Sequence, residues 1–127
     1  MTPLDAFDLP DWLGEGEVTW TSDDTTRSGA SVAGCLLGPD GTRHPCDLLA
    51  VDLAYPAPVV DDGIRTAAHQ AWRHGQVLLL DRDGRAALAV PGTSFTADTV
   101  LDAITRLAKA VGAAPASYSV RLRLGGG

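Results

Sequence analysis

The chain has very few of the side chains on which most catalytic and metal sites depend. Its 127 residues include one lysine, three histidines, two cysteines and one methionine. They contain no Gly-x-Ser-x-Gly motif, and Pro91-Gly92-Thr93-Ser94 lacks the lysine of a phosphate-binding loop. The sequence therefore predicts a protein that is not an enzyme and that needs no cofactor.

The sequence also lacks long hydrophobic runs and an excess of positive charge. No stretch reaches the roughly 18 apolar residues of a membrane-spanning helix, and residues 1–5 lack the basic and apolar regions of a signal peptide. The net charge of −6 argues against general binding to nucleic acid or anionic membranes. We therefore expect a cytoplasmic protein with reduced cysteines and with neither a nucleic-acid nor a membrane partner. Nine arginines against one lysine indicate a GC-rich, bacterial source.

What is present has the composition of one globular domain. Hydrophobic residues make up 45% and charged residues 20% of the chain, which is long enough to bury a core. We expect a single domain over 1–127, with an irregular docking segment at 1–15 and a flexible glycine tail at 125–127. The other hypothesis for the first segment is a short linear motif offered to a partner.

Hydrophobic periodicity predicts six strands and two helices. Alternation predicts strands over 17–21, 30–37, 44–53, 76–80, 85–90 and 117–124. Stripes at helical spacing predict helices over about 61–74, with Ile64, Ala67, Ala68, Ala71 and Trp72 inward, and over about 97–111, with Val100, Leu101, Ile104, Leu107, Ala108 and Val111 inward. This order, β-β-β-α-β-β-α-β, predicts an α+β fold. We expect one largely antiparallel sheet of five or six strands with both amphipathic helices on one face.

The charges are distributed unevenly along the chain. Seven acidic residues precede the first basic one, Arg27, whereas Arg106, Lys109, Arg121 and Arg123 lie near the carboxyl terminus. Opposite charges could match within one domain or across a self-association surface. We favour the internal match, because it needs no partner.

A hairpin near the middle of the chain could bring two thiols and an imidazole together. A two-residue turn at Asp40-Gly41 would place Cys35 opposite Cys46, and His44 would point to the same side of the sheet. These three residues could ligate zinc. The spacing matches no known zinc pattern and buried cysteine commonly acts as a small hydrophobic residue, so we favour a site without metal.

The first predicted helix carries a basic row opposite its apolar stripe. Arg65, His69 and Arg73 stand four residues apart and could bind a carboxylate, a phosphate or a protein partner. The alternative is a solvated face that binds nothing, which is the commoner case.

The last strand ends in Arg121-Leu122-Arg123-Leu124-Gly125-Gly126-Gly127. This tail resembles the ends of ubiquitin-like modifiers and of sulfur carriers of the same β-grasp family. The resemblance implies activation of the chain at Gly127, with Gly125 and Gly126 as the flexible approach. It covers about seven residues, and the first thirty residues have no counterpart in that family.

The favoured hypothesis is a protein that acts by protein–protein contact. The order of elements is similar in outline to small bacterial secretion chaperones, which implies an adaptor or chaperone-like role and a homodimer. We expect the last strand to form a sheet edge. Arg121 and Arg123 would then either protect that edge against aggregation or contact the partner.

Overall fold

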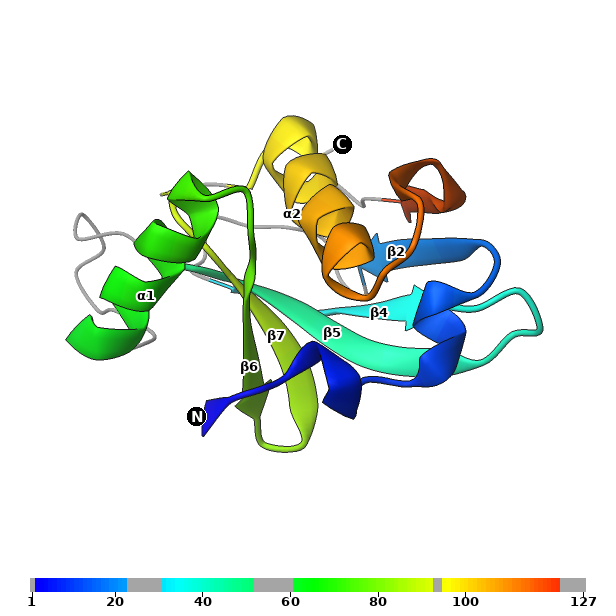
Figure 1. Cartoon of the computed structure of the whole chain (residues 1–127), viewed down its shortest axis with the longest axis horizontal. Coiled ribbons are helices and arrows are strands. Elements are labelled where there is room, and N and C mark those ends of the chain that lie inside the picture. Colours follow the sequence, from blue (N-terminus) through cyan, green and yellow to red (C-terminus); the bar gives the residue numbers. More distant parts are fainter. Residues whose placement is uncertain (1, 23–30, 52–60, 93–94, 122–127) are drawn as a thin grey trace.

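The computed structural model describes residues 2–22, 31–51, 61–92 and 95–121. Figure 1 shows two helices, α1 (Asp62–Arg73) and α2 (Ala97–Ala110), around a twisted sheet. The strands of that sheet are β1 (Thr2–Pro3), β2 (Val18–Ser22), β3 (Ser31–Val32), β4 (Gly34–Leu37), β5 (Arg43–Ala50), β6 (Leu78–Arg82), β7 (Arg85–Val90) and β8 (Tyr118–Arg121). Three short 3-10 turns are η1 (Ala6–Asp8), η2 (Asp11–Gly14) and η3 (Pro115–Ser117). None of the described helices has the length and hydrophobicity required to cross a bilayer.

The α+β class is confirmed, but the sheet is mixed and larger than expected. Its eight strands follow the order β1-β6-β7-β5-β4-β2-β8, with β3 also paired to β5. The prediction of a largely antiparallel sheet is wrong, because β5 pairs with β7 and β2 pairs with β8 in parallel. Each parallel pair is separated in sequence by helices and other strands, which supply the long crossover that parallel pairing requires.

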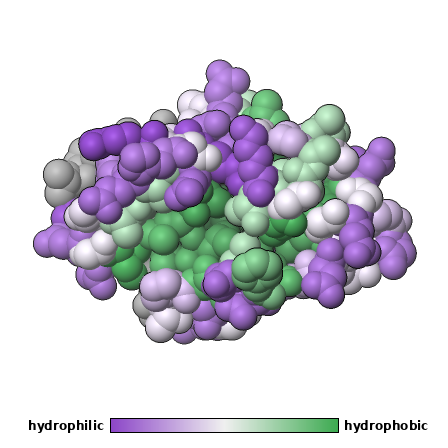
Figure 2. All heavy atoms as spheres, in the orientation of Figure 1, coloured by the Kyte–Doolittle hydropathy of each residue, from purple (hydrophilic) through white to green (hydrophobic). Residues whose placement is uncertain are grey.

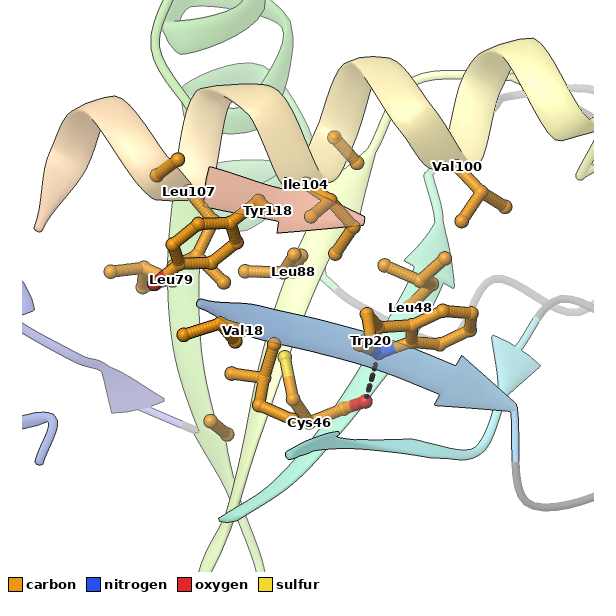
Figure 3. Packing of buried hydrophobic residues seen from close by; sticks show 14 of the residues in the cluster. Val18, Trp20, Cys46, Leu48, Leu79, Leu88, Val100, Ile104, Leu107 and Tyr118 are labelled. Carbon is orange, nitrogen blue, oxygen red and sulfur yellow. Dashed lines mark hydrogen bonds between the residues drawn. The ribbon is translucent and has the colours of Figure 1, made fainter. Parts of the chain in front are cut away.

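Strand β5 joins the two halves of the sheet. Its first part, residues 43–45, pairs with β4, and its second part, residues 46–50, pairs with β7. Inward side chains of seven strands, including Val18, Leu48 and Leu88, form one core with α2, and Figure 3 shows this packing beneath the helix. The β5 strand is therefore the element around which the sheet is assembled.

The two helices cover opposite faces of the sheet. Along β5 and just beyond it, Cys46 and Leu48 belong to the core that contains α2, whereas Leu49 and Val51 belong to the core that contains Ala68 of α1. Because successive side chains of a strand point to opposite faces, the helices lie on different sides. The prediction that both helices share one face is wrong.

Helix α2 is rotated slightly from the expected orientation. Ala103 is fully buried, whereas Leu101, which the sequence placed on the inward stripe, is 50% exposed. The buried residues of α2 are Val100, Ala103, Ile104, Leu107 and Ala108. Ala103 therefore lies on the face of α2 that contacts the sheet, and Leu101 lies outside that contact.

Trp20 crosses from β2 over β4 to β5. The hydrogen-bond ladder between β5 and its neighbours β3 and β4 stops on either side of Gly34, between the pairs Val32–Leu48 and Cys35–Pro45. In this gap the indole Nε1 of Trp20 donates to the carbonyl oxygen of Cys46 at 2.8 Å (Figure 3). A Cβ atom on Gly34 would lie 2.3 Å from the Trp20 ring. The absent side chain of Gly34 thus makes room for the indole.

Replacing Gly34 with alanine should destabilise the fold. The added methyl group would meet the rigid, buried Trp20 ring and the backbone, so the free energy of unfolding should fall by about 1–3 kcal/mol, as for other overpacked cores. Urea denaturation followed by tryptophan fluorescence measures this change. Ala33→Ser, at the exposed neighbouring position, should stay within about 0.5 kcal/mol of the wild type. Equal stability of Gly34→Ala and the wild type would contradict the close packing of Trp20.

Candidate protein-binding surfaces

Strand β8 lies at one end of the sheet. It pairs in parallel with β2 over four residues, from Val18–Tyr118 to Thr21–Arg121. Within the described residues it has no second neighbouring strand, because the strand order ends at β8. The expectation that the last strand forms an edge agrees with this placement. The opposite end of the sheet is β1, which has only two residues.

The two faces of β8 differ as its alternating sequence predicts. Tyr118 is buried and Val120 packs against the core, whereas Ser119 and Arg121 are exposed. The hydroxyl of Ser119 is hydrogen-bonded to that of Thr19 on β2 at 2.9 Å. The exposed face of this edge therefore carries hydroxyl groups and one cation, Arg121. Arg123 and the glycines Gly125, Gly126 and Gly127 lie outside the described residues.

Tyr118 anchors β8 to the rest of the domain. Its hydroxyl donates to the carbonyl oxygen of Leu13 in η2. Burial raises the pKa of Tyr118 from 10.0 to about 12. The neutral phenol is therefore the form that the fold stabilises.

The basic row of α1 is present, but two of its three side chains already contact other residues of the chain. Arg65 forms an ion pair with Asp62 and is 15% exposed. The Nε2 atom of His69 lies 3.0 Å from the carbonyl oxygen of Val51. Arg73 is exposed and has no such partner among the described residues. Together these residues line a shallow hollow of about 420 Å³, whose open cation is Arg73.

The cysteine and histidine hairpin has a different register from the one expected. Leu37 pairs with Arg43, and Gly38 N–H donates to the carbonyl oxygen of Thr42 at 2.8 Å. This leaves a three-residue loop in which Gly41 has a φ of 82°, the usual geometry when a left-handed residue follows a tight turn.

The longer loop separates the three candidate metal ligands. Cys35 pairs with Pro45, so it points to the side of the sheet opposite to His44 and Cys46. The predicted pairing of Cys35 with Cys46 is wrong, and in the described part of the chain no three His, Cys, Asp or Glu residues are grouped to hold a metal. Both cysteines are buried and free of disulfides, and burial raises the pKa of Cys46 far above its ordinary value.

A partly buried ion pair lies on the other side of the sheet beside Gly34. Arg85 of β7 donates from Nε and Nη2 to the two carboxylate oxygens of Asp47 on β5, at 3.0 and 2.8 Å. The guanidinium also reaches the carbonyl oxygen of Gly34, whose N–H donates to Asp47. Because these four hydrogen bonds link adjacent strands, the cluster has a structural role and holds β4, β5 and β7 together.

Phe7 is the exposed side chain that the sequence interpretation missed. Leu9 and Leu13 of the amino-terminal segment are buried, and Leu4 and Trp12 pack against the core. Phe7, which was expected to dock with them, is 95% exposed. The acidic residues on either side of it, Asp5 and Asp8, cap the turn. They are the signal that could have identified a turn that points outward.

Comparison of the chain with models of known protein families, with curated proteins and with solved structures finds no match.

Raising the pH above 10 should destabilise the domain through Tyr118. The pKa of Tyr118 is raised on folding, so its contribution to stability is complete below pH 10 and is lost as the pH rises through about 12. Tyr118→Phe has no phenol to titrate, so it should lose less stability over that interval. At pH 7 its free energy of unfolding should be lower than that of the wild type by about 0.5–1.5 kcal/mol, because the hydrogen bond is missing. Urea midpoints measured from pH 7 to pH 11 test this difference. Parallel curves for the two proteins would contradict it.

Proposed function

We propose that the protein acts by protein–protein contact, as an adaptor or chaperone-like domain that binds an extended segment of its partner along β8. The observation that carries this proposal is the position of β8 at the end of the sheet, with strand pairing on one side only within the described residues. The backbone groups on the other side of the strand can form the hydrogen bonds of an added strand.

The side chains of β8 indicate what such a segment should look like. A ninth strand would continue both faces of the sheet, so its residues would alternate between the core side of Tyr118 and Val120 and the outer side of Ser119 and Arg121. The core side favours apolar residues, and exposed Arg121 favours a carboxylate on the outer side. The partner segment is therefore an extended one that alternates apolar with polar or acidic residues.

A photo-reactive amino acid placed at Arg121 should crosslink to the partner in a native extract. The same group at Asp83, an exposed position on the β6–β7 turn, is the matched control and should give no such adduct. Arg121→Glu should weaken capture, because the outer-face carboxylate would then face a like charge. Identical adducts from positions 83 and 121 would contradict binding along β8.

The modifier hypothesis rests on the tail sequence and stays a prediction. Deletion of Gly126 and Gly127 separates the two functions in the same crosslinking experiment. If the protein works through β8, the deletion variant still crosslinks to its partner. If the chain is activated at Gly127, the deletion variant no longer forms conjugates through its tail.

A further inference from the structure

Phe7 is held outward by an ordered turn. Its own N–H donates to the Asp5 carboxylate at 3.0 Å, and the N–H of Asp5 lies 3.3 Å from a carboxylate oxygen of Asp8. The chain is fixed on both sides of this turn, because Leu4 N–H donates to Leu79 O and Leu9 is buried. The result is an aromatic ring, 95% exposed, with a carboxylate on either side. The backbone of this turn is already ordered and loses little conformational freedom on binding, and aromatic side chains are enriched at protein interfaces.

A hollow of about 490 Å³ lies directly beside this turn. Its lining includes the apolar side chains of Leu4, Ala6, Val77, Leu78 and Leu79, the cations Arg106 and Lys109 of α2, and Asp5 of the turn itself. Figure 2 shows apolar side chains gathered on this face of the molecule between polar rims. No residue of β8 lines the hollow, so this surface is separate from the edge considered above.

Among the described residues, the acidic turn around Phe7 and Lys109 have no ion pair with each other. The sequence favoured an internal match between the acidic front and the basic rear. Within the described residues, however, the ion pairs are Asp62–Arg65, Asp47–Arg85 and Asp102–Arg106, and none joins residues 5–17 to Lys109 or Arg121. Arg106 is further held by the Trp72 ring, 3.7 Å from the ring centroid. Lys109 is the exposed cation of the rim.

We infer that the occupant of this hollow is Phe7 of a second copy of the same chain. Phe7 offers an aromatic ring between two carboxylates, and the hollow offers apolar side chains beside the exposed cation Lys109. The chain carries both on one face, so a two-fold axis between them places each Phe7 in the hollow of the other copy. Asp5 and Asp8 of one copy then face Lys109 of the other, which is the self-complementary arrangement of a two-fold interface.

The single lysine of the chain makes this contact easy to identify. A carbodiimide couples a carboxylate to a neighbouring lysine, so treatment of the wild-type protein should give a covalent dimer in which Lys109 is joined to Asp5 or Asp8. Lys109→Arg keeps the charge and removes the reactive amine, so it should abolish this crosslink while leaving the sedimentation of the protein unchanged. Dimers linked through Lys109 to other acidic residues would overturn the inference.

Sedimentation equilibrium tests the role of the ring itself. At concentrations from about 5 to 500 μM, mass action should shift the wild type from the 13.2 kDa of one chain towards twice that mass. Phe7→Ala should raise the dissociation constant by about tenfold or more, because the ring is the central anchor. Leu101→Ala removes the other large apolar side chain that is exposed within the described ranges. Leu101 lies outside the hollow, so this change should leave the constant unchanged.

Three results would overturn the inference. They are a wild type that stays monomeric over this range, a Phe7→Ala variant that dimerises as tightly as the wild type, and a Leu101→Ala variant that weakens the dimer equally. Because Phe7 is exposed, its replacement leaves the folded core intact. Crosslinking from position 121 is read independently, so loss of the dimer and loss of partner binding along β8 are distinguishable.

Discussion

The Trp20 indole, which passes over Gly34 to reach β5, fixes how the strands of the sheet are arranged. It joins β2 to β5 across β4 at the point where the hydrogen-bond ladder is interrupted. On the other side of the sheet, Asp47 and Arg85 tie the same stretch of β4 to β5 and β7. The two halves of the sheet are thereby held in one arrangement, and α2 closes the core that they enclose. Both proposed surfaces, the edge at β8 and the Phe7 hollow, are positioned by this frame.

Local structure could be predicted from the sequence because local chemistry determines it. The helix over 61–74 is found at Asp62–Arg73, with Asp61 as its N-cap, and the helix over 97–111 is found at Ala97–Ala110, capped by Thr96. The strand over 85–90 has the same bounds in the structure. In each case the residues that set the periodicity lie within a single segment, and for the helices the capping residues lie there as well.

Pairing and register could not be predicted, because they depend on residues far apart in the chain. Nothing local to β5 indicates that it runs parallel to β7, and the alternation of β8 is the same for either direction of pairing. One extra loop residue before Thr42 was enough to move Cys35 to the other side of the sheet. Phe7 was assigned to the core because hydrophobicity alone does not reveal that a capped turn points outward. The edge position of β8 was anticipated, whereas the hollow beside Phe7 required side chains from three separate segments.

Hydrogen exchange at the indole N–H of Trp20 tests this account most directly. The proton is buried and donated to the carbonyl oxygen of Cys46, so NMR should show it exchanging only through global unfolding, with a protection free energy equal to the unfolding free energy from urea. A protection free energy well below the unfolding free energy would show that the link between β2 and β5 opens on its own. That result would contradict the role of Trp20 in holding the two halves of the sheet together.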